Sequence, residues 1–232
     1  MARFISYSQE FEDIIIYVVL KDYVKKGMYI DVGANDPIKF SVTKLFYDIG
    51  WSGINIEPLD DMCELLAAER PRDINLCMGA GAKVDVMKLA VAQMGSTFAL
   101  DIQNKMGEKL FYIEKPILPL SLIYDRYCTN KEVHFCKIDV EGFEKEVLQG
   151  IDFQKMRPWL FIIEAAEPGT DIPSYEKWEY ILLDNDYEFA FDMGINRYYV
   201  AKEKRFLKDK FEKIGKFLKE NECYIMNMIR VN

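Results

Sequence analysis

The sequence MYIDVGAND at residues 28–36 is an apolar run that ends in an acid and a small-residue turn. A second apolar run, at residues 53–56, ends in Glu57. A strand with a tight glycine turn, followed by a strand that ends in an acid, is typical of a nucleoside-binding α/β domain. Gly33 would let the backbone come close to a ligand, and the Glu57 carboxylate can accept two hydrogen bonds from a ribose diol.

Length, composition and charge narrow the class of protein. The chain has 232 residues, and 50% of them are hydrophobic, so it can form one α/β domain with a sizeable core. Its net charge of −8 disfavours nonspecific binding to nucleic acid. No apolar run is long enough to span a bilayer, and the N-terminus lacks a basic segment followed by an apolar one. We therefore expect a cytoplasmic protein without a transmembrane segment.

The five cysteines, at positions 63, 77, 128, 136 and 223, are odd in number and scattered along the chain. They form no CxxC pair and no cluster with the single histidine, His134. Disulfide frameworks and zinc sites have more regular spacings. The sequence therefore predicts neither, and we expect most of the cysteines to be small buried hydrophobic residues.

Apolar runs that predict strands alternate with amphipathic segments that predict helices. Strands are expected at residues 28–32, 53–57, 74–78, 133–140 and 159–165, with one or two short strands in 84–98. Helices are expected near residues 11–19, 45–49, 62–66, 143–148 and 175–182, and residues 187–201 predict a hairpin. The alternation predicts a Rossmann-like, doubly wound α/β fold. Its sheet would be mostly parallel and covered on both faces, with an antiparallel hairpin strand at the C-terminal end.

A lysine-rich segment follows this hairpin, so we divide the chain into a domain at residues 1–202 and a C-terminal helical extension at 203–232. Leu207, Phe211, Ile214 and Leu218 have helical spacing and form an apolar seam, while lysines dominate the other faces. The preferred interpretation is a helix that packs on its own domain or on a twin subunit, which would make a homo-oligomer. The alternative is a helix that binds a membrane surface or an anionic partner.

Four predicted strand ends carry acids or small residues: residues 31–33, 57–58, 139–142 and 164–165. Ligands of open α/β sheets bind beyond the carboxyl ends of the strands, where the strand order reverses. A single acid of this kind can equally be a helix N-cap or a surface carboxylate. The four together predict a ligand site along one edge of the sheet.

The glycine turn also indicates which nucleoside ligand fits. A dinucleotide site needs G-x-G-x-x-G, so that a helix N-terminus can approach a pyrophosphate. Residues 33–37 read GANDP, with one glycine and an acid, Asp36, where phosphate oxygens would lie. This disfavours NAD and P-loop nucleotides. S-adenosylmethionine fits better, because its ammonium and sulfonium groups are cationic and it carries no phosphate.

Several motifs together resemble the FkbM-type methyltransferases, a branch of the class I S-adenosylmethionine-dependent enzymes. They are YIDVGANDP at residues 29–37, GINIEP at 53–58, KIDVEGFE at 137–144, RPW at 157–159, IIEA at 162–165 and NRYYV at 196–200. The sequence YSQEFED at residues 7–13 resembles the lead-in of a subgroup linked to polysaccharide clusters. The resemblance covers residues 5–202, and the joint presence of DVGAN and KIDVEG makes it specific.

The resemblance implies a seven-stranded sheet and S-adenosylmethionine-dependent methyl transfer to a hydroxyl of a sugar, polysaccharide precursor or polyketide-like small molecule. It places the methionine moiety beside Asp31, Gly33 and Asn35, the ribose on Glu57, and the adenine near the end of the third strand. The residues expected to contact the cofactor are Gln9, Asp31, Gly33, Ala34, Asn35, Glu57, Pro58, Met78, Gly79 and Asp139. The chain departs from the family pattern at residues 119–122, which read PLSL where Thr-Leu-Asp is common.

Methyl transfer to a hydroxyl is an in-line displacement that requires alignment and a general base. His134 lies at the start of a predicted strand, far from the ligand edge, and is expected to be structural. The candidate catalytic residues are therefore the carboxylates Asp139, Glu141 and Glu164. The preferred base is Asp139 or Glu141, with its pKa raised by burial and by the neighbouring acid. In the alternative, these acids bind a divalent cation that orients the hydroxyl.

Two other functions stay open at this stage. One is a non-catalytic nucleoside-cofactor-binding partner protein that uses the C-terminal helix. The other is an NAD-dependent oxidoreductase on a similar sheet, which the missing glycines disfavour. The loop at residues 166–173 and the pair Ser96-Thr97 are further candidates for the acceptor side of the site.

Overall fold

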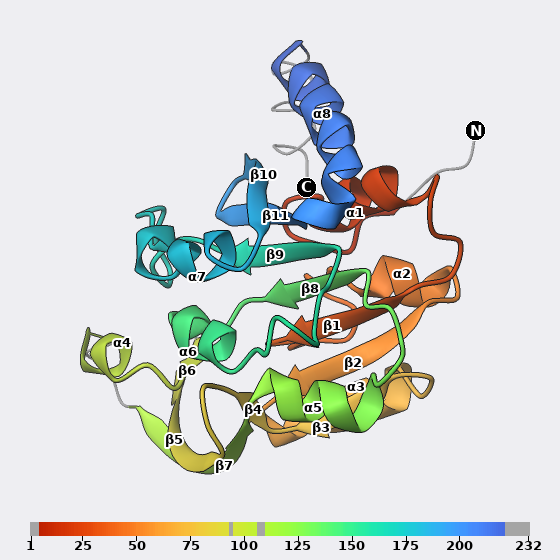
Figure 1. The fold of residues 1–232 in the computed structure, drawn as a ribbon. Helices are drawn as coiled ribbons and strands as arrows, with labels where there is room; N and C mark the ends of the chain where they lie inside the picture. Colours follow the sequence, from red (N-terminus) through yellow and green to blue (C-terminus); the bar gives the residue numbers. More distant parts are fainter. Residues whose placement is uncertain (1–4, 93–94, 106–109, 221–232) are drawn as a thin grey trace.

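The computed structural model describes residues 5–92, 95–105 and 110–220. Within these ranges the chain forms a large seven-stranded sheet with helices on both faces, and a small four-stranded sheet beside it (Figure 1). The strands of the large sheet are β1 (Met28–Val32), β2 (Ser52–Glu57), β3 (Ile74–Cys77), β8 (Phe135–Ile138), β9 (Leu160–Glu164), β10 (Tyr187–Met193) and β11 (Asn196–Ala201). The α-helices are α1 (Glu12–Leu20), α2 (Lys44–Asp48), α3 (Asp60–Glu69), α4 (Leu100–Lys105), α5 (Leu120–Tyr127), α6 (Glu144–Gln149), α7 (Glu179–Leu183) and α8 (Lys208–Glu220), and short 3-10 helices lie at Tyr175–Lys177 and Lys202–Leu207.

The strand order of the large sheet is β10-β11-β9-β8-β1-β2-β3. Strand β11 is antiparallel to both of its neighbours, β9 and β10, and the other neighbouring strands are parallel. These features confirm the predicted doubly wound, mostly parallel sheet with an antiparallel hairpin strand. The order reverses between β1 and β8, so a crevice is expected beyond the ends of these two strands.

Successive residues of the central strands pack into two separate apolar cores, one on each face of the large sheet. In β9, for example, Phe161 and Ile163 belong to one core, and Leu160 and Ile162 to the other. Residues of α5, α6 and α7 complete the first core, and residues of α1, α2 and α8 complete the second. Because both faces are buried, these strands read as continuous apolar runs in the sequence.

The small sheet consists of β4 (Gly79–Ala80), β5 (Asp85–Ala92), β6 (Gly95–Thr97) and β7 (Phe111–Leu118), in the order β4-β7-β5-β6. The strands predicted within residues 84–98 are confirmed by β5 and β6. Strand β7 was not predicted, because much of it is exposed and it contains Pro116, a residue that argues against a strand. The small sheet carries Ser96 and Thr97 toward the end of the large sheet.

Helix α8 packs on its own domain. Phe211 is fully buried, and its ring stacks on Phe191 of β10 with 5.8 Å between the ring centroids. Lysines of α8 also form ion pairs with the domain, including Lys208 with Glu188 at 3.0 Å. These contacts support the first interpretation of the C-terminal segment up to residue 220. None of the helices in the described ranges has the length and apolar character that crossing a bilayer requires.

The expectation that the chain has no disulfide is wrong for one pair. Cys63 of α3 and Cys77 of β3 form a disulfide, with 5.6 Å between their Cα atoms. Cys128 and Cys136 are free and buried, as expected, and Cys223 lies outside the described residues. The spacing of Cys63 and Cys77 in the sequence did not indicate this bond. The two cysteines come together only in the folded chain, because α3 turns back beside β3.

Removing this disulfide is expected to lower stability. The bond closes a loop with a sequence separation of 14, for which the loss is about 3 kcal/mol in the chain-entropy model. Cys77→Ser should therefore lower the urea midpoint, and dithiothreitol should lower the wild-type midpoint but not that of the variant. A thiol titration of denatured wild type that gives the same count with and without prior reduction would contradict the pairing.

Candidate functional site

A cavity of about 340 Å³ opens beyond the ends of β1 and β8, where the strand order reverses. Most of the predicted site residues line it, namely Gln9, Gly33, Ala34, Asn35, Glu57, Pro58, Met78, Gly79, Asp139 and Glu141. Asp31 and Glu164 do not line it. Three of the four predicted strand ends, at residues 31–33, 57–58 and 139–142, thus meet at one place, and the fourth, at 164–165, does not reach the cavity.

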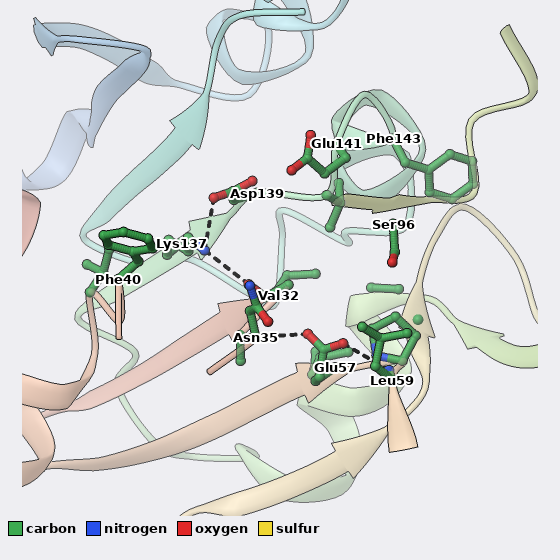
Figure 2. A pocket seen from close by; sticks show the side chains of 18 of the residues that line it. Val32, Asn35, Phe40, Glu57, Leu59, Ser96, Lys137, Asp139, Glu141 and Phe143 are labelled. Carbon is green, nitrogen blue, oxygen red and sulfur yellow. Dashed lines mark hydrogen bonds and ion pairs between the residues drawn. The ribbon is translucent and has the colours of Figure 1, made fainter. Parts of the chain in front are cut away.

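The Glu57 carboxylate is fixed by backbone groups on two sides. The N–H of Asn35 donates to Oε2 at 2.8 Å, and the N–H of Leu59 donates to Oε1 at 2.9 Å (Figure 2). Glu57 is 4% exposed, and burial raises its pKa while these two hydrogen bonds oppose the rise. Since a carboxylate oxygen accepts more than one hydrogen bond, both oxygens can still accept from a ligand.

Gly33 is required by the protein backbone itself. Its φ is +76°, in the left-handed region, and a Cβ built on it would lie 1.8 Å from the carbonyl oxygen of Asp139. The sequence suggested that this glycine makes room for a ligand. The structure shows that it also makes room for the end of β8, so that the turn after β1 and the residues after β8 touch.

Lys137 connects three of these segments. Its Nζ lies 3.3 Å from Oδ2 of Asp139 (Figure 2). It also donates to the carbonyl of Gly33 at 3.1 Å and lies 3.7 Å from Oδ1 of Asp31. Burial alone would lower the pKa of Lys137, but Asp139 and Asp31 outweigh it and raise the pKa. The ammonium therefore stays charged and holds the DVGAN and KIDVEG motifs together.

Asp31 is buried beneath the cavity and does not line it. Thr43 Oγ1 donates to its Oδ2 at 2.8 Å, and its only ion pair within the described residues is with Lys137. Burial raises the pKa of Asp31, while Lys137 and Thr43 lower it. The structure thus gives Asp31 a supporting place under the turn after β1, because its side chain points into the layer covered by α2.

Glu164 also lies outside the cavity, behind Asp139. It is 6% exposed, and its pKa is raised well above the ordinary value by burial and by the nearby negative charge of Asp139. It therefore carries a proton at neutral pH and can hydrogen-bond to Asp139. Because Glu164 does not line the cavity, the geometry does not support the catalytic role predicted for it.

Glu141 projects from a loop with an unusual backbone. Both Glu141 and Gly142 have positive φ, at 55° and 94°. The loop is held by Thr97 Oγ1, which donates to the carbonyl of Glu141 at 2.8 Å. It is also held by the buried Glu144, which accepts from the N–H groups of Val140 and Gly142 at 3.2 and 3.1 Å. Such strain in a well-supported loop is common at functional sites.

The surroundings of Glu141 raise the pKa of its carboxyl group. Burial, and then the negative charge of Asp139, raise the pKa of Glu141 to about 7. Its carboxylate forms no salt bridge within the described residues, whereas Asp139 is paired with Lys137. Figure 2 shows the two carboxylates side by side at one wall of the cavity. Glu141 is therefore the more available proton acceptor near neutral pH.

Sequence reasoning missed several residues of the cavity. Its lining also includes Glu10, Glu12, Lys39, Phe40, Leu59, Ser96, Phe98, Lys137, Phe143, Ile195 and Asn196, of which only Ser96 had been considered. Lys137 lies inside the KIDVEG motif, so its polarity within an apolar strand was the signal that could have found it. Glu10 and Glu12 come to the cavity because they bind the β10–β11 turn, with Asn196 Nδ2 donating to Glu12 Oε1 at 2.9 Å.

Two other predicted features lie away from this cavity. The loop at 166–173 contributes Glu167 and Pro168 to a second cavity of about 130 Å³ and not to the main one. His134 lies before β8, at the opposite end of the strand, where its Nδ1 accepts from the N–H of Met28 at 3.1 Å.

Over the described ranges, no group of three or more His, Cys, Asp or Glu side chains has the geometry of a metal site.

The sequence profile of the methyltransferase FkbM domain matches residues 31–189, which is most of the chain. A crystal structure of methyltransferase FkbM from Methylobacillus flagellatus KT is similar over 84% of this chain and 56% of that chain, with 17% identity and a TM-score of 0.48. The chain thus spans little more than half the length of that protein, and no curated protein sequence matches it. The extent of the profile match shows that this chain belongs to the FkbM methyltransferase family.

Proposed function

We propose that the cavity binds S-adenosylmethionine and that the protein methylates a hydroxyl of a sugar or polysaccharide precursor. The observation that carries the proposal is the buried Glu57 carboxylate, held by two backbone N–H groups in the same cavity as Asp139 and Glu141. A carboxylate fixed in this way suits a ribose diol. Leu59, Met78 and Phe98 line the same cavity and offer apolar surface for an adenine.

The charge of the cavity also suits this donor. Five acids line it among the described residues, which favours a ligand with cationic ammonium and sulfonium groups over one with phosphates. The turn at residues 33–35 would border the methionine part of the donor, between the ribose at Glu57 and the pair of Lys137 and Asp139. NAD stays the poorer candidate, because the turn has one glycine and no helix N-terminus for a pyrophosphate.

Bound S-adenosylmethionine supplies an electrophilic methyl group, which is chemistry that protein side chains lack. The residues of this chain would align the acceptor hydroxyl and remove its proton. We assign the base to Glu141, because its pKa lies near neutrality and its carboxylate has no salt bridge within the described residues. Asp139 already accepts from Lys137, so it is better suited to hold the acceptor or the donor in place.

The acceptor class is inferred from two features. The lining includes the hydrogen-bonding side chains of Gln9, Ser96 and Asn196, which suit a ligand with several hydroxyls. The segment YSQEFED, which resembles a subgroup linked to polysaccharide clusters, supplies Gln9, Glu10 and Glu12 to the cavity. A carbohydrate hydroxyl is therefore the acceptor that we favour over a polyketide-like one.

The rate of methyl transfer is expected to depend on pH through Glu141. Its pKa is raised from 4.5 to about 7, so the carboxylate is protonated, and inactive as a base, below that value. The rate should fall about tenfold per pH unit below pH 6 and level off above pH 8. Initial rates between pH 5 and 9 at constant ionic strength test this. A profile that stays level down to pH 5 would show that no group with this pKa controls the reaction.

Binding and transfer experiments test the proposed function in two steps. Calorimetry should detect binding of S-adenosylmethionine and of its demethylated product, and no binding of NAD. Transfer of a labelled methyl group to a library of sugars and polysaccharide precursors should then yield labelled carbohydrate. Binding without transfer to any hydroxyl compound would instead support the non-catalytic partner protein, and binding of NAD alone would reject the proposal.

A further inference from the structure

We infer that Lys39 binds the carboxylate of the donor's amino-acid end and so selects donors that carry this group. The inference rests on the proposed function, because it concerns S-adenosylmethionine in the same cavity. Lys39 lines the cavity but belongs to none of the motifs that predicted the site. Three observations support the assignment: the charges of the cavity, the partners of its lysines and the way the Lys39 loop is built.

The amino-acid end of the donor carries a cationic ammonium and an anionic carboxylate. The acids of the cavity favour the ammonium but not the carboxylate. Glu10, Glu12, Glu57, Asp139 and Glu141 line the cavity, and they can balance the ammonium and the sulfonium. The same acids repel a carboxylate. A cation in the lining would offset this repulsion, and the described lining offers two lysines, Lys39 and Lys137.

Lys137 is already engaged. Its ammonium has three hydrogens, and the structure places three acceptors around it: the Gly33 carbonyl, Asp139 and Asp31. Lys39 differs, since it forms no ion pair within the described residues. Its ammonium lies over the ring of Phe40, with 5.0 Å from Nζ to the ring centroid. Lys39 is thus the lysine of the cavity that can take a new anion.

Hydrogen bonds hold the loop that carries Lys39 in place, although the side chains of residues 38–40 are exposed. Asp36 Oδ1 accepts from the N–H groups of Ile38 and Lys39, at 2.8 and 2.7 Å. The fully buried Arg70 donates from Nε to the carbonyl of Pro37 at 3.1 Å and from a terminal nitrogen to Ser41 at 2.8 Å. A lysine on a braced loop loses less backbone freedom when it binds a ligand.

Phe40 shows that this loop holds a defined shape. Its φ is +58°, an unfavourable value for an aromatic residue, and its side chain lines the cavity while it remains 58% exposed. Figure 2 shows Phe40 beside Lys137, on the opposite side of the cavity from Leu59 and Phe143. The adenosine is proposed at the Leu59 side, so the amino-acid end extends toward the loop of Lys39 and Phe40.

A thermodynamic cycle that combines two ligands with wild type and one variant tests the inference. The ligands are S-adenosylmethionine and its decarboxylated form, and the variant is Lys39→Met. The matched control is Lys44→Met, which removes the same charge from a nearby helix, at a lysine that is paired with Asp48 and does not line the cavity. Calorimetry on the whole protein gives the dissociation constant of each pair, and thermal melting checks that each variant is folded.

Lys39→Met is expected to weaken binding of S-adenosylmethionine about fivefold to tenfold and not to weaken binding of the decarboxylated donor. Lys39→Arg should restore most of the affinity, and Lys44→Met should change both ligands by less than about twofold. Equal losses for both ligands in Lys39→Met, or no loss for S-adenosylmethionine, would overturn the inference. Failure of the wild type to bind either donor would instead overturn the proposed function, so the two failures are distinguishable.

Discussion

Replacing Glu141 with glutamine is expected to slow methyl transfer about 100-fold to 10,000-fold, the range for loss of a general base. Glutamine keeps the size of the side chain but cannot accept the proton. Because Glu57 and the turn at 33–35 are untouched, the affinity for S-adenosylmethionine should change by less than about twofold. Rates of labelled methyl transfer, measured beside calorimetric dissociation constants, separate the two effects.

Glu164→Gln is the matched control for this variant. Burial and Asp139 raise the pKa of Glu164 so far that the native side chain already carries a proton, and a glutamine mimics that state. This variant should keep most of the rate, although Glu164 lies behind Asp139. If Glu164→Gln abolishes transfer and Glu141→Gln does not, the base assignment is wrong.

Replacing Gly33 with alanine is expected to cost at least about 3 kcal/mol of stability and to abolish donor binding. A left-handed φ costs an alanine about 1–2 kcal/mol. The larger part comes from the Cβ, which would lie 1.8 Å from the carbonyl oxygen of Asp139 and force the ends of β1 and β8 apart. Urea unfolding and calorimetry with S-adenosylmethionine measure the two effects.

Gly169→Ala provides the control, because it isolates the backbone cost. Gly169 also has a left-handed φ, of +68°, but a Cβ there would meet no atom within 4 Å. Its variant should lose about 1–2 kcal/mol and keep donor binding. Equal losses in the two variants would show that the contact between the turn and the end of β8 is not tight.

Pattern and motif together predicted the large sheet and the place of the cavity at its edge. Strands buried on both faces produce apolar runs that can be recognised without a structure, and their ends carry Gly33, Glu57 and Asp139 in regular positions. Because parallel strands align their carboxyl ends, these residues had to meet at one edge. Other cofactor residues that line the cavity, such as Gln9, Met78 and Gly79, were predicted from the family resemblance and not from the strand pattern.

The roles of individual acids were decided only by the tertiary structure. Asp31, Glu141 and Glu164 all follow or end strands, and nothing local distinguishes them. They differ in their position relative to the cavity. Asp31 and Glu164 are buried outside it, while Glu141 lies on its wall. The acids also differ in their contact with Lys137. It forms ion pairs with Asp31 and Asp139 and no salt bridge with Glu141.

The sequence by itself determined the strands of the large sheet and the edge of that sheet at which the cavity lies, because these follow from local periodicity and from the direction of parallel strands. Contacts between distant segments depended on how those elements pack. The disulfide of Cys63 and Cys77 formed because α3 turns back along β3. The Lys39 loop became part of the cavity because Arg70, which follows α3, supports it from beneath. Such pairings need the folded chain, since no local spacing encodes them.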